Sequence, residues 1–194
     1  MTENLICEYS RTGRRTRFML RYYSKIWVNK IMLIDKSEVI FNMNLAEQFV
    51  ILDETYLPQM AELYKSAFEQ EPWNDNWSDN CQLTEYIKEI SGSFHSLNYG
   101  LLINGKLSAL SIGIIRHWWE GTNYNIEEFC VSPDVQCKGI GSRFMKMIEA
   151  DIQKRGLSGI FLQTDNDKPS YQFYQKNGFN ELDSHVSFYK RLSE

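Results

Sequence analysis

The sequence contains no apolar run that approaches the roughly 20 residues a membrane-spanning helix needs. We therefore expect no membrane-spanning segment. Potential metal ligands are also scarce, because the four cysteines lack C-x-x-C spacing and the three histidines are scattered. This pattern argues against a zinc site, and we predict no metal centre. The cysteines are expected to be reduced, which indicates a cytoplasmic location.

The composition is that of an ordinary globular protein. Hydrophobic residues make up 43% of the chain and charged residues 24%, both close to the usual values. A chain of 194 residues is long enough for one well-buried domain and short for two.

Positive charge is concentrated near the start of the chain. Residues 1–42 contain eight Lys or Arg and four Asp or Glu, a net charge of +4, whereas the whole chain carries −4. Three interpretations fit this segment: an arm for nucleic acid or a membrane surface, a targeting peptide, or an extension of uncertain order. We favour an extension ahead of a domain that spans residues 43–194, because every interpretable pattern lies there. We do not expect a nucleic-acid partner.

Beyond residue 43, hydrophobic periodicity and turn residues predict an alternation of strands and helices. Strands are predicted at 49–52, 99–103, 106–119, 123–131, 159–164 and 186–190. Helices are predicted at 53–68, 81–90, from residue 140 onward, and at 169–176, with a structured loop over 69–80. Asn104-Gly105 fits a two-residue hairpin turn. This order predicts an α/β layered domain, a mixed sheet with helices on its faces.

A pair of glycines, Gly139 and Gly141, opens the helix that begins at Ile140. A strand that turns through glycines into a helix leaves backbone N–H groups unpaired at the helix start, and these groups bind anions such as phosphate. The alternative is that the glycines only shape a tight turn. The loop is not a nucleotide-binding P-loop, because it lacks the G-x-x-x-x-G-K spacing. It is not a Rossmann loop either, because Phe144 stands where the third glycine belongs.

Two blocks of sequence resemble the GNAT superfamily of N-acetyltransferases. Residues 136–141, QCKGIG, match the superfamily's Q/R-x-x-G-x-G/A signature. Residues 167–179, DKPSYQFYQKNGF, resemble its later helix, whose signature ends in a tyrosine followed after three residues by Gly-Phe. The blocks occur in the family's order with a strand between them, and the resemblance covers about residues 45–191. It implies the acyl-CoA N-acyltransferase fold, a single-domain mixed sheet flanked by helices.

The resemblance also implies acetyl-CoA as co-substrate. Its pyrophosphate would accept hydrogen bonds from backbone N–H groups of residues 137–142, and its pantetheine arm would pair along residues 129–131. Glycine is common in the family at position 137, so a cysteine there is a departure. The residues expected to bind the coenzyme are Phe129, Cys130, Val131, Gln136, Cys137, Lys138, Gly139, Ile140, Gly141, Ser142 and Asp167.

The same resemblance suggests the catalytic groups. An amine with a pKa near 10 arrives protonated, so a carboxylate must accept its proton before it can attack. The strand YNIEEFCV resembles that of spermidine/spermine acetyltransferases, with acids at Glu127 and Glu128. Alternation along a strand lets only one of the two face the cleft. We prefer Glu127 by resemblance and keep Glu128 as a substrate-binding or structural alternative. Tyr174 occupies the family's usual position for the acid that protonates the CoA thiolate.

The acceptor is predicted from residues 66–87, which contain five acids and no Lys or Arg. Such a stretch could steer a cationic amine, and four tryptophans could face an ammonium group or a sugar ring. Equally, the acids could cap helices and the tryptophans could pack in the core. The residues concerned are Glu69, Glu71, Asp75, Asp79, Glu85, Trp73, Trp77, Trp118 and Trp119.

Two functions are consistent with the sequence. The preferred one is an N-acetyltransferase that acts on a small, cationic primary amine by direct attack in a ternary complex. The alternative is a non-catalytic acyl-CoA-binding or sensing module with the basic segment 1–42 as its contact to a partner. The retained Tyr174 and acidic strand favour the enzyme. A homodimer is left open.

Overall fold

A computed structural model describes residues 46–192, and the predictions made for residues 1–42 lie outside this range. None of the helices within it is both long and apolar enough to cross a bilayer. The strands are β1 (Glu47–Leu52), β2 (Asn98–Ile103), β3 (Lys106–Trp118), β4 (Gly121–Val131) and β5 (Gly159–Phe161). The α-helices are α4 (Leu57–Phe68), α5 (Asn80–Ser91), α6 (Ile140–Lys154) and α7 (Pro169–Lys176), with short 3-10 helices at Glu54–Tyr56 and Pro133–Val135.

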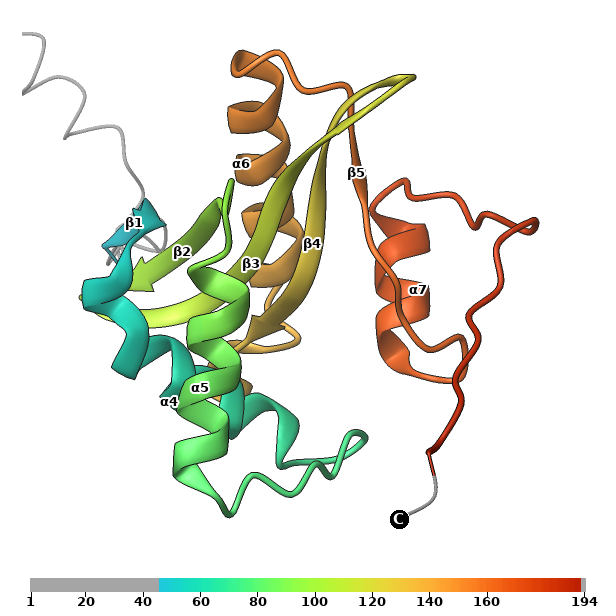
Figure 1. The fold of residues 1–194 in the computed structure, drawn as a ribbon. Coiled ribbons are helices and arrows are strands. Elements are labelled where there is room, and N and C mark those ends of the chain that lie inside the picture. The colour runs from blue at the N-terminus through green and yellow to red at the C-terminus, as the bar shows by residue number, and fades with distance from the viewer. Residues whose placement is uncertain (1–45, 193–194) are drawn as a thin grey trace, which may run out of the picture. The chain divides into compact units, whose positions relative to one another are not determined.

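The five strands form one mixed sheet in the order β1-β2-β3-β4-β5. Neighbours are antiparallel up to β4, and β5 runs parallel to β4. The predicted hairpin turn is confirmed, since Asn104 and Gly105 have φ values of 53° and 80°, both positive as a type I′ turn requires. Helices α4 and α5 cover one face of the sheet and α6 covers the other (Figure 1).

Each face of the sheet carries its own apolar cluster. Helical periodicity places a stripe of large side chains on each covering helix, and the strands alternate between the two faces. Under α4 and α5 the buried residues are Leu52, Met60, Leu63, Tyr64, Ala67, Phe68, Leu83, Ile87, Leu107, Leu110, Ile112 and Cys130. Under α6 they are Leu97, Tyr99, Leu101, Ile103, Ala109, Tyr124, Ile126, Ile140, Phe144, Met145, Ile148 and Ile152.

Strand β4 contains a β-bulge at Glu127. Glu128 is opposite Ile112 on β3, and the next pair is Ile126 opposite Gly113, so Glu127 has no partner of its own. An extra residue of this kind shifts the alternation of the strand.

The bulge changes which face the rest of β4 presents. Before it, Tyr124 and Ile126 belong to the cluster under α6. After it, Glu128 contacts α4 and α5, and Cys130 belongs to the cluster under those helices. If Glu127 were paired regularly in the ladder, strict alternation would carry Glu128 toward α6 instead.

The predicted strand at 186–190 is wrong. These residues form no ladder, and their one side-chain contact to the sheet region is a hydrogen bond from Gln163 Nε2 to Ser187 Oγ of 3.2 Å. Val186 and Phe188 are 73% and 94% exposed. An alternating apolar pattern favours a strand only where a sheet edge pairs with it. Strand β5 also ends at Phe161, three residues earlier than predicted.

Candidate active site around strand β4

The start of α6 presents free backbone N–H groups, as the glycine pattern predicts. Gly139 is the N-cap, has a φ of 74°, and supplies no side-chain cap. A Cβ atom at this position would meet nothing within 4 Å, so the space next to the helix start is open. The first N–H groups of an α-helix have no acceptor within the helix, and the helix dipole adds positive potential there.

Side chains hold the loop that leads into α6. Gln136 Nε2 donates to the carbonyl of Val131, and Lys138 Nζ donates to the carbonyl of Asp134, each at 2.9 Å. Cys137 has a φ of 59°, an uncommon conformation for a residue with a side chain. The predicted loop residues therefore form one exposed turn whose conformation is set before any ligand binds.

Gly141 has a different role from Gly139. A Cβ atom on Gly141 would lie 3.1 Å from Cε2 of Phe173 and 3.5 Å from Cγ2 of Val131. Its lack of a side chain therefore lets α6 approach both α7 and the end of β4.

The outer edge of β4 is unpaired beside this helix start. The ladder between β4 and β5 ends at Asn125 and Phe161, so residues 126–131 have no strand partner on the β5 side within the described chain. Figure 1 shows the chain turning away from β4 after β5, toward α7. Backbone groups of this stretch are thus available to pair with an amide-rich ligand.

Side chains of the same stretch serve packing. The Phe129 ring stacks between the rings of Phe144 and Phe173, with centroid distances of 5.6 and 5.5 Å. Cys130 is buried on the opposite face, where burial and the nearby Glu128 raise the pKa of its thiol. The side chains of Phe129 and Cys130 are therefore engaged in packing, and the backbone groups of this stretch remain available to a ligand.

Glu128 is enclosed by two tyrosines. Tyr86 on α5 and Tyr64 on α4 both donate to its Oε1, the Tyr64 bond being 3.4 Å long. Burial raises the pKa of the Glu128 carboxyl, the two tyrosine hydrogen bonds oppose that rise, and the charges of Asp75 and Glu127 add to it. Oε2 has no hydrogen-bond partner among the described residues.

Glu127 lies in a different environment. It is the bulged residue of β4, it is exposed, and no hydrogen bond holds its carboxylate within residues 46–192.

Tyr174 approaches β4 from the other side. It lies on α7, where its half-buried ring packs edge-on against Phe129, Phe173 and Phe179 at centroid distances of 6.4, 5.2 and 5.4 Å. Burial, followed by the charges of Glu128 and Cys130, raises the pKa of its phenol. The hydroxyl therefore stays protonated at neutral pH and can serve as a proton donor.

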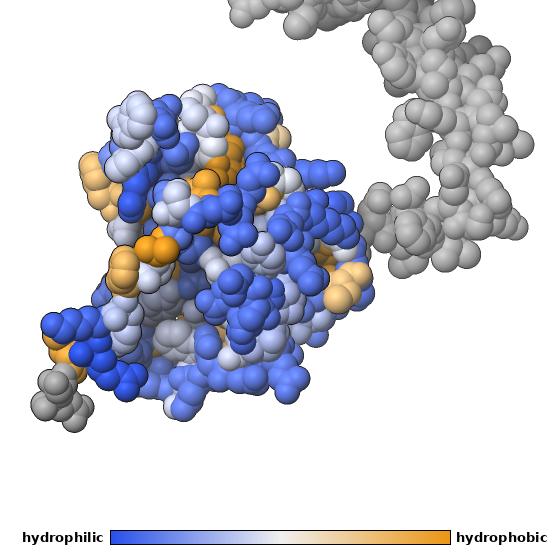
Figure 2. Space-filling view, turned by 90° about the vertical axis from the view of Figure 1, so that its right-hand side faces the viewer, coloured by the Kyte–Doolittle hydropathy of each residue, from blue (hydrophilic) through white to orange (hydrophobic). Residues whose placement is uncertain are grey.

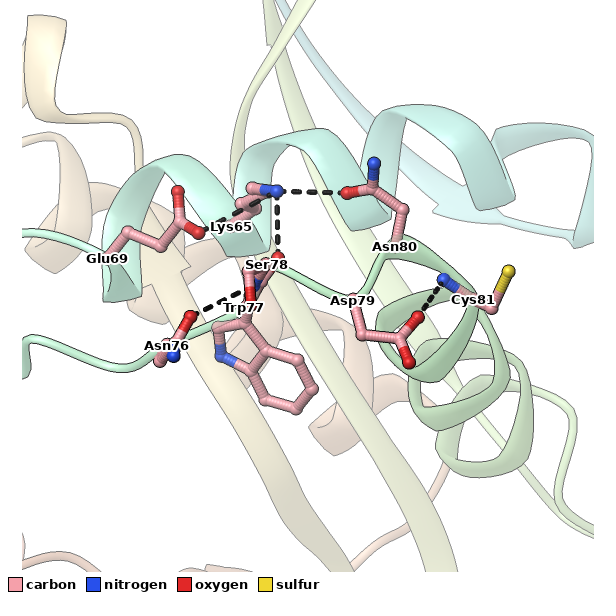
Figure 3. Close-up of polar contacts among 8 residues, drawn as sticks. All are labelled: Lys65, Glu69, Asn76, Trp77, Ser78, Asp79, Asn80 and Cys81. Atoms are coloured by element: carbon pink, nitrogen blue, oxygen red, sulfur yellow. Dashed lines mark hydrogen bonds and ion pairs between the residues drawn. The ribbon is translucent and has the colours of Figure 1, made fainter.

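The loop between α4 and α5 forms a wall beside Glu128. Lys65 Nζ anchors it by donating to the carbonyl of Trp77 at 2.8 Å and to Oδ1 of Asn80 at 2.9 Å (Figure 3). The Trp77 ring stacks on Tyr86 with centroids 5.5 Å apart and meets Tyr64 edge-on at 5.6 Å. The loop thus closes an aromatic cluster over the glutamate.

Structural roles account for three of the five predicted steering acids. Glu69 pairs with Lys65 at 3.7 Å, and Glu85 pairs with Lys88 at 3.8 Å. Asp79 accepts bonds from the backbone N–H groups of Cys81 and Gln82 and caps α5. Glu71 and Asp75 are exposed and form no ion pair within the described residues, so they are the members of the set available to a ligand.

The four tryptophans divide into two groups. Trp73 and Trp77 pack in the cluster under α4 and α5, as the core alternative predicted. Trp118 and Trp119 are 59% and 82% exposed at the tip of the β3–β4 hairpin, and Figure 1 shows this tip at the opposite end of the sheet from the α4–α5 loop. The structure does not bring these two to the site.

Asp167 is exposed on the loop before α7 and makes no hydrogen bond with another described residue. Its neighbour Lys168 donates to the carbonyl of Pro72 at 3.1 Å and so joins this loop to the α4–α5 loop. Within residues 46–192 no cluster of His, Cys, Asp and Glu side chains could hold a metal ion.

Sequence reasoning missed Tyr64, Tyr86 and Lys65. Tyr64 lies among the buried residues of α4, where a tyrosine looks like any packing residue. The only signal for Tyr86 was a polar atom on a large side chain next to the apolar face of α5, between Leu83 and Ile87.

Comparisons with known proteins agree with this geometry. The family model described as Acetyltransferase (GNAT) family matches residues 57–179. The ribosomal protein bS18-alanine N-acetyltransferase of Escherichia coli is 30% identical over 94 residues. That match covers 48% of this chain and 61% of the relative, so the chain spans less than two thirds of that protein's length.

Solved structures share the fold. An aminoglycoside acetyltransferase from an uncultured soil metagenomic sample superposes with a TM-score of 0.59 at 20% identity, covering 76% of this chain and 97% of its own. A possible acetyltransferase from Clostridium difficile 630 gives a TM-score of 0.65 at 15% identity, covering 76% of this chain and 99% of its own. The predicted sheet flanked by helices is confirmed.

Proposed function

Because the chain belongs to the GNAT acetyltransferase family, we propose that it transfers the acetyl group of acetyl-CoA to a primary amine. The observation that carries the proposal is the unpaired stretch of β4. It has Glu128 on one side, Tyr174 on the other, and the open start of α6 at its end. A thioester bound along this stretch would lie between a proton acceptor and a proton donor.

The coenzyme would be held mainly by backbone groups. Its pyrophosphate would accept hydrogen bonds at the start of α6, where Gly139 leaves the space open. Its pantetheine amides would pair with the outer edge of residues 129–131. Lys138 lies in the same loop and adds a positive charge near the phosphates.

The reaction requires that the acceptor nitrogen lose two protons and that the CoA thiolate gain one. Glu128 accepts a proton from the ammonium group of the acceptor, and the free amine attacks the thioester carbonyl carbon. The C–N bond forms, the C–S bond breaks, and the departing thiolate takes a proton from the Tyr174 hydroxyl. The nitrogen of the new amide releases its second proton, which restores the Tyr174 phenol, and Glu128 returns its proton to water. The raised pKa of Tyr174 keeps that proton in place until the thiolate forms.

We assign the proton acceptor to Glu128, although the family resemblance alone favours Glu127. Glu128 has one oxygen held by tyrosines and the other without a partner in residues 46–192, whereas Glu127 is exposed at the bulge. A base must lie within hydrogen-bond reach of the proton it removes, and a fixed carboxylate meets this condition more often than a mobile one.

A small cationic amine is the proposed acceptor. Glu128, Glu127 and Asp75 place negative charge on one side of the site, and the aromatic residues of the α4–α5 loop suit an ammonium group. The names of the relatives point to two acceptor classes, aminoglycosides and a ribosomal protein with an alanine as the acetylated residue. The three carboxylates favour the small polyamine or aminoglycoside class.

A thiol-release assay tests the proposal. The full chain is mixed with acetyl-CoA and a panel of polyamines, aminoglycosides, amino acids and basic peptides, including one with an N-terminal alanine. Release of CoA with one acceptor class, strongly reduced in Tyr174→Phe, is the expected result. Tight binding of acetyl-CoA without release for any acceptor would contradict the enzyme and favour the sensing module.

A further inference from the structure

The two tyrosines around Glu128 bind the same oxygen of its carboxylate. Tyr86 and Tyr64 come from different helices, yet both hydroxyls donate to Oε1. The contact from Tyr64 is long, at 3.4 Å, and the contact from Tyr86 is much shorter. Tyr86 is therefore the stronger donor, and Oε2 is left for another partner.

The position of Tyr86 is itself fixed by the aromatic cluster. Its ring stacks on Trp77 at 5.5 Å with an interplanar angle of 24° and lies 5.7 Å from the ring of Tyr64. Lys65 holds the backbone of Trp77 and the side chain of Asn80, where α5 begins. The bulge at Glu127 turns Glu128 toward α4 and α5, so the Glu128 carboxylate reaches the hydroxyls of both tyrosines.

We propose that Tyr86 is the positioning residue for Glu128, with Tyr64 as a weaker second donor, and that it fixes one carboxylate oxygen so that the other receives the acceptor's proton. This inference rests on the proposed acetyl transfer and assigns to Tyr86 a role that acts through Glu128. Tyr86 itself does not contact the reacting atoms in this scheme.

The proposal predicts a specific change with pH. A hydroxyl that donates to a carboxylate stabilises the ionised form and lowers its pKa, so removal of the Tyr86 hydroxyl raises the pKa of Glu128. Glu128 must be ionised to accept a proton, and the acidic limb of the kcat/KM profile therefore moves to higher pH. The other titratable groups near Glu128 are Tyr64 on α4, Asp75 on the loop, Glu127 and Cys130 on β4, and Tyr174 on α7.

The test compares Tyr86→Phe, Tyr64→Phe and a matched control in the full-length chain. Tyr99→Phe is the control, because the Tyr99 hydroxyl also donates to a carboxylate, Oδ2 of Asp151 at 2.8 Å, but under α6 and away from the site. Each variant is checked for folding by its thermal melt and is then assayed across pH. In parallel, NMR titration follows the labelled side-chain carboxyl carbon of Glu128, identified by its loss in Glu128→Gln.

Tyr86→Phe should lose roughly tenfold in kcat at neutral pH, with little change in KM for acetyl-CoA. Its acidic limb and the titration of Glu128 should both move to higher pH. Tyr64→Phe should shift both in the same direction by less, and Tyr99→Phe should lower only the melting temperature. An unmoved Glu128 titration in both site variants overturns the proposal, as does an equal shift in Tyr99→Phe.

The two readouts separate this inference from the proposed function. If no acceptor releases CoA from the wild-type protein, acetyl transfer fails, but the Glu128 titration still decides whether Tyr86 controls that carboxylate. If the enzyme is active and the titration does not respond to Tyr86→Phe, only the positioning role fails. If Tyr86→Phe does not fold, Tyr64→Phe must show the smaller shift, and its absence overturns the proposal.

Discussion

Glu128 and Tyr174 flank the same stretch of β4, but the two sides of that strand are built differently. On the Glu128 side, α4 buries five residues, and Lys65 ties down the loop that leads into α5. On the Tyr174 side, α7 has no fully buried residue. A cavity of about 650 Å³ lies on this side, and residues of β5, α6, α7 and the C-terminal segment line it. Figure 2, which views the molecule from this side, shows hydrophobic groups scattered over a mainly hydrophilic surface.

This contrast indicates how Glu128 and Tyr174, the proposed proton acceptor and donor, would be used. The side of the strand that holds Glu128 is assembled before a ligand arrives, and aromatic rings enclose the Glu128 carboxylate. The side that holds Tyr174 is stabilised mainly by ring packing among Phe129, Phe173, Tyr174 and Phe179. A coenzyme lying along β4 would add contacts where the protein has fewest.

Replacing the base is expected to have the largest effect. Glu128→Gln keeps the shape of the side chain but removes the group that accepts the proton, so kcat should fall about a thousandfold while acetyl-CoA binding changes little. Steady-state kinetics and calorimetric titration with acetyl-CoA measure the two quantities. Glu127→Gln is the matched variant and should lose less than about tenfold. The reverse order of the two losses would return the base to Glu127.

Removing the acid should cost less. Tyr174→Phe keeps the ring that packs on Phe129 but removes the hydroxyl, and kcat should fall about a hundredfold. Acetyl-CoA binding should be nearly unchanged. Tyr171→Phe on the same helix removes a hydroxyl that donates to Glu181 and serves as control. Equal turnover in the two variants would remove Tyr174 from the mechanism.

The anchor of the α4–α5 loop should affect stability first. Lys65→Met removes hydrogen bonds to Trp77 and Asn80, so the free energy of unfolding should fall by about 1–2 kcal/mol. Hydrogen exchange at the start of α5 should become faster. Lys88→Met breaks only an exposed ion pair with Glu85 and should change stability by less than about 0.5 kcal/mol. Similar losses in both would mean that the loop is not anchored by Lys65.

The smallest effect is expected in the C-terminal segment. Phe188 is 94% exposed, so Phe188→Ser should change the free energy of unfolding by less than about 0.5 kcal/mol. Phe144, fully buried under α6, provides the contrast, since Phe144→Ala should cost about 3–5 kcal/mol. Chemical denaturation measures both. A loss above about 2 kcal/mol for Phe188→Ser would show that the segment packs against the domain.

Local sequence signals predicted most of the fold. Helical periodicity identified α4, α5, α6 and α7, and the Asn104-Gly105 turn identified the β2–β3 hairpin. The strand predicted at 186–190 failed because alternation describes a surface that suits a sheet and does not show whether an edge is available. The same limit applies to β5, whose ladder ends where it diverges from β4.

The site could be predicted only in part. The glycine pattern located the start of α6, because the positive φ at the N-cap favours glycine and so can be recognised in the sequence. The tyrosines around Glu128 left no such signature, since a tyrosine within an apolar stripe looks like any packing residue. The bulge was also invisible, because nothing in NIEEF distinguishes one glutamate as the extra residue.

The bulge lets β4 carry one residue more than β3 over the same stretch, so the pairing of the strand matters more than the identity of the residue at 127. If residue 127 instead took a regular place in the ladder, every later residue of the strand would exchange faces, sending Phe129 toward α4 and α5 and Glu128 toward α6. Loss of the residue would have no such effect, because Ile126 and Glu128 already oppose neighbouring residues of β3. A single-residue gap at this point in an alignment would therefore mark a protein with a regular β4 whose glutamate still faces α4 and α5.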